Sequence, residues 1–162
     1  MALKLSTRGR YGMRALCCLA SNDNGKPLSI QTISDAEKIP LRYLEQIMSR
    51  LRRGGIVKSI RGPKGGYELC KKPFEISLDL ILQVLEGSLA IVWCADTGKK
   101  RRCTRENHCF TKGFWNLLNR GITDVLKQVT LADLASNDWE HKMLTISFAD
   151  QKTNHSGESD DK

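Results

Sequence analysis

The segment from Leu41 to Arg53 carries the sharpest helical pattern in the chain, and this pattern limits the possible fold more than any other feature. On a helical wheel its apolar and polar side chains separate: Leu41, Leu44, Ile47, Met48 and Leu51 lie on one side, and Arg42, Glu45, Gln46, Ser49, Arg50 and Arg53 on the other. Such a helix packs through its apolar face and leaves the other face exposed. The pattern therefore predicts a helix that presents a polar, largely basic surface.

The segments on either side predict a winged helix-turn-helix. Upstream, Ser29 is a good N-cap for a short helix, which Lys38-Ile39-Pro40 ends just before the main helix. Downstream, Gly54-Gly55 ends the main helix, and two β-like runs, 56–60 and 67–70, flank the sequence RGPKGG. Two short helices joined by a tight turn are typical of a helix-turn-helix, and a hairpin behind them forms a wing. RGPKGG lacks the spacing of a phosphate-binding loop, so close approach of its backbone to DNA explains its glycines better.

Further periodic segments complete a mainly α fold with a small β wing. We expect a first helix over 7–21, a helix over 78–86 between Ser77 and Gly87, a long helix over 110–129 and a short one over 131–134. The predicted organisation is a winged helix-turn-helix DNA-binding domain (1–87), a cysteine loop (88–109), a dimerisation helix with a short C-terminal helix (110–136), and an extension (137–162). The extension has almost no apolar residues from about residue 150, so we expect disorder there.

The long helix carries an apolar stripe: Phe110, Phe114, Leu118, Ile122 and Leu126 recur every fourth residue, and Leu117, Val125 and Val129 widen it. A soluble monomer rarely exposes an apolar surface of this size. The stripe therefore predicts a homodimer joined through this helix. The alternative is that the whole stripe packs within one chain.

The positive charge of the chain is confined to its first half. Lys and Arg number 26 against 18 Asp and Glu, a net charge of +8, but residues 1–72 hold fifteen bases and five acids, or +10, and the rest eleven and thirteen, or −2. A basic module beside a neutral one favours double-stranded DNA as the partner over a merely solvated basic surface. The side chains expected to reach bases and phosphates are Arg42, Glu45, Gln46 and Arg50 on the main helix, with Arg61 and Lys64 on the wing.

The six cysteines divide into two groups. No apolar stretch is long enough to span a bilayer and no secretory segment is evident, so we expect a cytoplasmic protein with reduced thiols. Packing explains Cys17, Cys18 and Cys70 best. The other three, Cys94, Cys103 and Cys109, share one polar loop with the spacing C-x8-C-x5-C, and His108 precedes the last thiol. Three such thiols indicate a metal or cluster, and the spacing leaves zinc and iron–sulfur both open.

Several stretches resemble the IscR-type iron–sulfur transcription regulators of bacteria, members of the Rrf-two superfamily. These are KLSTRGRYGMRAL, YLEQIMSRLRRGGIVKSIRGPKGGYEL, the three loop cysteines and QVTLADL, and the likeness spans roughly residues 3–136. The resemblance implies a dimeric winged-helix regulator with a cluster, [2Fe–2S] rather than [4Fe–4S], on Cys94, Cys103 and Cys109. It also implies recognition-helix contacts from Arg42, Tyr43, Glu45 and Gln46, and a wing contact from Arg61.

At the positions that supply a fourth cluster ligand in the family, this chain has other residues. Close relatives carry a histidine three residues after the last cysteine, where this chain has Lys112. The nitric-oxide-sensing branch can use a carboxylate near the N-terminus, where this chain has Arg10. Local candidates are His108 and Glu106, and a residue of the partner subunit is a further one.

The predicted function is therefore a sequence-specific transcription regulator that reads a pseudo-palindromic operator and responds to iron–sulfur status, oxygen or redox state, or nitric oxide. One alternative is a winged-helix regulator with structural zinc; another senses oxidants directly through Cys103 and Cys109. An enzyme is not expected, because the three histidines and the acids form no nucleophile–base or paired-carboxylate pattern.

Overall fold

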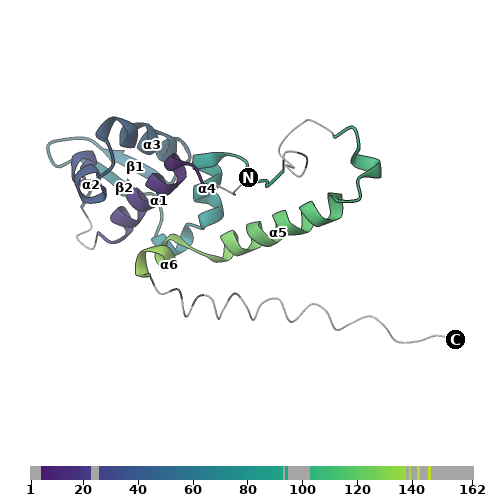
Figure 1. Cartoon of the computed structure of the whole chain (residues 1–162). Helices are drawn as coiled ribbons and strands as arrows, with labels where there is room; N and C mark the ends of the chain where they lie inside the picture. Colours follow the sequence, from purple (N-terminus) through teal and green to yellow (C-terminus); the bar gives the residue numbers. More distant parts are fainter. Residues whose placement is uncertain are drawn as a thin grey trace.

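The structure, a computed structural model, describes residues 5–22, 26–92, 94, 103–137, 139, 142 and 146 of the 162-residue chain. Its elements follow in the order α1 (Thr7–Ala20), α2 (Ile30–Glu37), α3 (Leu41–Arg53), β1 (Val57–Ile60), β2 (Gly66–Leu69), η1 (Pro73–Glu75), α4 (Leu78–Glu86), η3 (Glu106–His108), α5 (Lys112–Gln128) and α6 (Leu131–Ser136). Helices α1 to α4 and the two strands gather in one lobe, from which α5 extends (Figure 1). This architecture confirms the expected mainly α fold with a small β wing.

Helices α2 and α3 form the helix-turn-helix. Ser29 caps α2 by accepting a hydrogen bond from a first-turn N–H at 3.0 Å. Lys38 ends α2 in the left-handed conformation, with φ of 52°, and so takes the position that glycine often occupies. Pro40 then precedes α3 and Gly54 follows it. The predicted helix from Leu41 to Arg53 is therefore confirmed at both ends.

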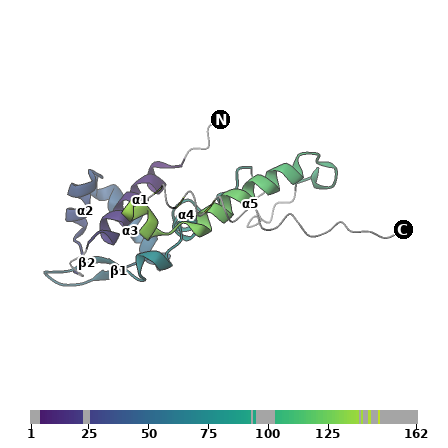
Figure 2. The ribbon, with the colours of Figure 1, turned by 90° about the horizontal axis from the view of Figure 1, so that it is seen from below.

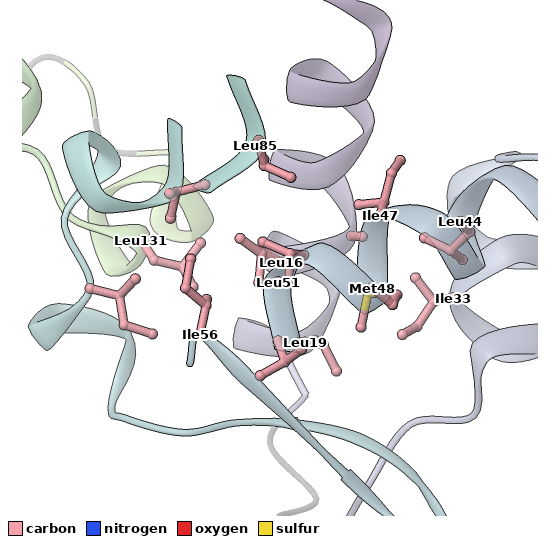
Figure 3. Close-up of a cluster of buried hydrophobic side chains, with 14 of the residues drawn as sticks. Leu16, Leu19, Ile33, Leu44, Ile47, Met48, Leu51, Ile56, Leu85 and Leu131 are labelled. Atoms are coloured by element: carbon pink, nitrogen blue, oxygen red, sulfur yellow. The ribbon is translucent and has the colours of Figure 1, made fainter. Parts of the chain in front are cut away.

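Side chains from five helices form a single core (Figure 3). The predicted buried face of α3 is confirmed at Leu44, Ile47, Met48 and Leu51, each of which is 0 % exposed. The prediction is wrong at Leu41, which is 38 % exposed. Leu41 lies in the first turn, and the buried residues of α3 begin only one turn further on.

The wing is an antiparallel hairpin in which Ile60 lies opposite Gly66. Both strands lie within one residue of the predicted runs. Leu28, before α2, joins the hairpin through two backbone hydrogen bonds with Tyr67, of 3.0 and 2.8 Å. Glycine is needed at position 66, because an added Cβ would collide with the Leu28 carbonyl oxygen. The sheet is thereby fixed to the segment that leads into the helix-turn-helix.

The three cysteines outside the loop do not behave alike. Cys17 and Cys18 are half-buried in α1, whereas Cys70 is exposed. The backbone N–H of Cys70 donates to Ile56 O at 2.9 Å, but its side chain lies past the last paired position of β2. The expectation that Cys70 is a packing residue is therefore wrong.

Helix α5 joins the lobe only at its C-terminal end. It begins at Lys112, two residues after the expected start, and points away from the lobe in both views (Figures 1 and 2). Beyond it, Val129 is buried, and its carbonyl accepts a hydrogen bond from the Leu78 N–H at 2.9 Å. Leu131 donates to Ile76 O at 2.8 Å and is fully buried, so α6 returns to the core.

Two expectations lie at least partly outside the described residues: the disordered tail from about residue 150, and positions 95–102 of the predicted cysteine loop. Among the residues that the structure describes, no helix is long and apolar enough to cross a membrane.

Candidate functional site

The residues expected to contact DNA lie on the outer side of α3 and at the tip of the wing. All six are exposed, and we call them the recognition surface: Arg42, Glu45, Gln46, Arg50, Arg61 and Lys64. The opposite side of α3 is locked in the core, which fixes the rotation of the helix. The polar face predicted from the sequence is therefore available for contacts with another molecule.

Tyr43, also expected to contact DNA, is half-buried, in contrast to the six exposed residues. It also packs within the lobe. Its ring meets Tyr11 edge to face, with centroids 6.0 Å apart and an interplanar angle of 76°. The Arg14 guanidinium lies 5.6 Å from the Tyr11 centroid, and its Nε is 3.0 Å from Glu37 Oε2. This chain of contacts links α1 to both helices of the helix-turn-helix and orients the first turn of α3.

The start of α3 has no side-chain cap. Pro40 provides no side-chain cap, and its carbonyl accepts from the N–H groups of Tyr43 and Leu44, both at 2.9 Å. An N-terminus without a side-chain cap favours phosphate oxygens, because its N–H groups and the helix dipole attract negative charge. Arg50, Arg52 and Arg53 lie in the last turn, where positive charge complements the dipole.

The wing carries basic residues in two places, on its strands and at its tip. On the strands, Lys58 Nζ lies 2.8 Å from Glu68 Oε1, and this hydrogen bond raises the pKa of the lysine. At the tip, Gly62 has φ of 116°, a conformation that favours glycine, and its carbonyl accepts from the Gly65 N–H at 2.9 Å. This tight turn carries Arg61 and Lys64.

The three loop cysteines meet in a second site beside the start of α5. One cavity, which we call the cysteine pocket, is lined by Cys94, Cys103, Glu106, Cys109, Lys112, Trp115 and Asn116. The thiols expected to act together are therefore brought together. Glu106 lines the same cavity, whereas the exposed His108 is not among the lining residues.

Short-range hydrogen bonds hold this wall of the pocket. The Glu106 N–H donates to Cys103 O at 3.0 Å, and the Lys112 N–H donates to Cys109 O at 3.3 Å. Across the turn, Lys112 Nζ lies 2.9 Å from Glu106 Oε1. The first turn of α5 is thus connected to the 3₁₀ turn η3.

Cys109 is the most acidic of the thiols for which a shift is resolved. Its Sγ lies 3.4 Å from Thr111 Oγ1, and this hydrogen bond, with smaller contributions from the Thr111 and Lys112 N–H groups and the Arg105 charge, lowers the pKa of the thiol. Hydrogen bonds and nearby positive charge favour the thiolate, which is the form that ligates metals.

Cys17 has the opposite environment. Burial, followed by the negative charge of Glu37 and then by Cys18, raises the pKa of Cys17 to about 11. Burial, followed by the negative charge of Glu37, also raises the pKa of Cys18. These two thiols are suited to packing rather than to ligation or rapid oxidation.

The cysteine pocket does not hold a preformed metal site. Among the described residues, no three His, Cys, Asp or Glu side chains are arranged to hold a metal ion. The donor chemistry nevertheless fits an iron–sulfur cluster, because three thiols and a carboxylate line the same cavity. Binding would have to draw these side chains together.

The sequence analysis missed the role of Lys112, Trp115 and Asn116 in the pocket wall. A partial signal was present, because Cys103 with Glu106 and Cys109 with Lys112 are pairs three residues apart, the span that the Glu106 N–H and Lys112 N–H hydrogen bonds close.

The apolar stripe on α5 is largely uncovered. Phe114, Leu117, Leu118 and Val125 are 56, 70, 38 and 42 % exposed, and Phe110, in the turn before α5, is fully exposed. The alternative that the whole stripe packs within one chain is therefore wrong. Only the C-terminal end of the helix is covered by the lobe.

Comparison with known proteins agrees with these features. A family model described as Rrf2, an iron-dependent transcriptional regulator, matches residues 5–137. The HTH-type transcriptional regulator IscR of Vibrio vulnificus is 33 % identical over 153 residues, which cover 94 % of this chain and 89 % of that protein. IscR of Pectobacterium atrosepticum is 35 % identical over 135 residues, which cover 83 % and 80 %.

Solved structures give the same result. The T. potens IscR structure is 35 % identical, with a TM-score of 0.66, and the match covers 86 % of this chain and 91 % of that one. CymR, titled the global cysteine regulator of B. subtilis, is 36 % identical, with a TM-score of 0.67 and coverage of 85 % and 98 %. The family resemblance seen in the sequence is confirmed, and the relatives are regulators rather than enzymes. With its winged helix-turn-helix and a match over most of its length, this chain belongs to the Rrf2 family of transcriptional regulators.

Proposed function

We propose that this regulator binds operator DNA as a homodimer, and that an iron–sulfur cluster held by Cys94, Cys103 and Cys109 controls the binding. The observation that carries the proposal is that these three cysteines line one pocket beside α5, at a distance from the recognition surface along the chain. The site of the cluster and the site of DNA binding are then two parts of one regulator.

The recognition surface has the chemistry to read a DNA sequence. Arginine pairs with guanine, glutamine pairs with adenine, and a glutamate accepts from the cytosine amine, so Arg42, Gln46 and Glu45 can each contact a different base. Arg61, on the wing, has the charge and length to enter a minor groove. A fixed helix rotation supports such contacts, because the reading side chains then start from defined positions.

The exposed stripe on α5 supports a homodimer. Two copies that cover each other's stripe remove the largest apolar side chains of α5 from water. A two-fold dimer places two recognition helices on two half-sites, so the operator should be a pseudo-palindrome with half-sites about one helical turn apart, or a multiple of it. Such binding takes place in the cytoplasm, where bacterial DNA lies.

The proposed cluster is [2Fe–2S], as the resemblance to IscR-type regulators implies, and three thiolates leave one of its four ligand positions to another side chain. When bound, such a cluster supplies a one-electron redox centre whose presence depends on iron and sulfide supply, on oxygen and on nitric oxide. Cluster capture is coupled to ordering of the pocket, since the described side chains are not yet arranged for a metal. The pocket adjoins α5, so this ordering would alter the orientation of the two recognition helices in the dimer.

The test uses the full chain purified without oxygen, with DNA selected from a random-sequence library. We expect a visible chromophore with matching iron and sulfide contents. Cys94→Ala, Cys103→Ala and Cys109→Ala should each abolish it and change operator affinity to a similar extent. Cys70→Ala is the matched control, because that thiol is exposed but is not part of the pocket.

Other outcomes would contradict the proposal. Bound zinc without sulfide would establish the structural-zinc alternative. A metal-free protein whose DNA binding responds to peroxide through Cys103 and Cys109 would establish direct thiol sensing. Unchanged operator affinity in all three loop-cysteine variants, with and without oxygen, would show that the cluster is not the switch.

A further inference from the structure

We infer that Glu106 is the fourth, non-cysteine ligand of the cluster, and that Lys112 is a positioning residue that holds its carboxylate at the pocket. This inference rests on the proposed function, since it concerns the same cluster. It assigns an oxygen ligand from within the chain.

The pocket wall selects Glu106 by chemistry. Besides the three thiols, its lining residues are Glu106, Lys112, Trp115 and Asn116. A lysine ammonium has no lone pair to give, and a tryptophan indole is a donor only. A carboxylate is therefore the only anionic ligand that the described lining residues add to the thiols.

The backbone places Glu106 between two of the thiols. Its N–H donates to Cys103 O at 3.0 Å, and Cys109 follows three residues later, with its own carbonyl bonded to the Lys112 N–H at 3.3 Å. The 3₁₀ turn η3 covers Glu106–His108, and Cys103 and Cys109 flank it on either side. His108 belongs to the same turn but is not among the lining residues.

The Lys112 ammonium holds the carboxylate without preventing ligation. Its Nζ lies 2.9 Å from Glu106 Oε1, and the side chains are 47 and 43 % exposed. A carboxylate has two oxygens with several acceptor positions, so one can bind iron while the other keeps the lysine. The positive charge also offsets the negative charge that three thiolates and a carboxylate bring to one site.

Lys112 supports the carboxylate rather than competing with it. A protonated lysine has no lone pair with which to bind iron. The same lysine instead reaches back by one turn and fixes Glu106.

The decisive measurement is pulsed EPR of the reduced cluster in the full chain, prepared with ¹⁵N-labelled histidine. We expect no histidine nitrogen coupling in the parent protein. Glu106→His should retain the chromophore and acquire that coupling, which requires that position 106 reaches the iron. Its reduction potential should also rise, because a neutral ligand replaces an anion.

Loss variants separate the ligand from the positioning residue. Glu106→Ala should change the visible and EPR spectra and shorten the half-life of the cluster under a chelator by at least about tenfold. Lys112→Met should keep the spectral type and shorten the half-life by roughly tenfold, the lower end for loss of a group that supports a ligand. Lys127→Ala, exposed on α5 outside the pocket, is the control and should match the parent, with circular dichroism confirming that every variant is folded. His108→Ala and Asn116→Ala test the two rival ligands and should keep the cluster and its spectral type.

The results distinguish this inference from the proposed function. A parent cluster with directly coupled histidine nitrogen, an unchanged spectrum in Glu106→Ala, or loss of the cluster in Asn116→Ala would overturn the assignment and leave the cluster regulator intact. A parent protein that takes up no iron and sulfide would overturn both.

Discussion

Replacing Leu117 with alanine tests whether the stripe on α5 joins two chains. Leu117 is 70 % exposed, and full burial of a leucine side chain contributes about 1.5–3 kcal/mol. Covering the exposed part in a dimer therefore contributes about 1–2 kcal/mol per chain, or about 2–4 kcal/mol for the two copies of a two-fold interface. The expected effect of Leu117→Ala is a rise in the dimer Kd of roughly 30- to 700-fold.

Sedimentation equilibrium over a range of concentrations measures this Kd directly. Alanine favours helix at least as strongly as leucine, so α5 itself should stay intact, and circular dichroism checks this. Lys127→Ala is the matched control, because Lys127 is exposed on the same helix but lies off the stripe. The argument would be refuted by a parent protein that is monomeric at micromolar concentration, or by an equal change of the dimer Kd in Leu117→Ala and Lys127→Ala.

Four further predictions concern the recognition surface and the thiols. Arg61→Ala should weaken operator binding and reduce the slope of log affinity against log salt by about one, because one phosphate contact is lost; Arg120→Ala, on α5, should leave the slope unchanged in the same titration. Glu45→Ala should keep or tighten binding but relax discrimination at a cytosine position by roughly 1–3 kcal/mol, and equal losses on specific and scrambled DNA would show that Glu45 is not a base reader. Cys17, with its pKa raised to about 11, should react with iodoacetamide at pH 8 more slowly than Cys109 in the apo protein. Because the pKa of Cys17 is higher in the folded chain than in the unfolded chain, its contribution to stability is complete below pH 9 and is lost as the pH rises through 11. The free energy of unfolding, measured with urea between these pH values, should therefore fall less in Cys17→Ala than in the parent protein.

The sequence was sufficient to predict the ends of a helix where these depend on residues within the same turn. The bounds of α3 follow from Pro40, Gly54 and the apolar period between them, and the capped start of α4 follows from Ser77. Such capping signals act over a few residues, so they can be recognised in a sequence. The same reasoning placed Phe110 in the long helix, although α5 begins two residues later, because a periodic apolar residue does not mark the first turn.

The cysteine pocket could be predicted only in part from the sequence. The sequence identified Cys94, Cys103 and Cys109 as one group, since they share a polar segment that cannot form a core. It could not choose between His108 and Glu106, which lie two residues apart in a short turn. What separates the two residues is the tertiary surroundings: Glu106 lines the cavity and pairs with Lys112, whereas His108 is not among the lining residues.

The sequence by itself determined the helices, the wing, the basic half and the family, because each rests on neighbouring residues or on residue type. Tertiary structure decided what is covered: Leu131 returns to the core, Cys70 stays outside it, and most of the α5 stripe remains exposed. Burial depends on segments that are distant along the chain and meet only when it folds. For the same reason, the contact between Glu106 and Lys112 emerged only once η3 and the first turn of α5 were placed side by side.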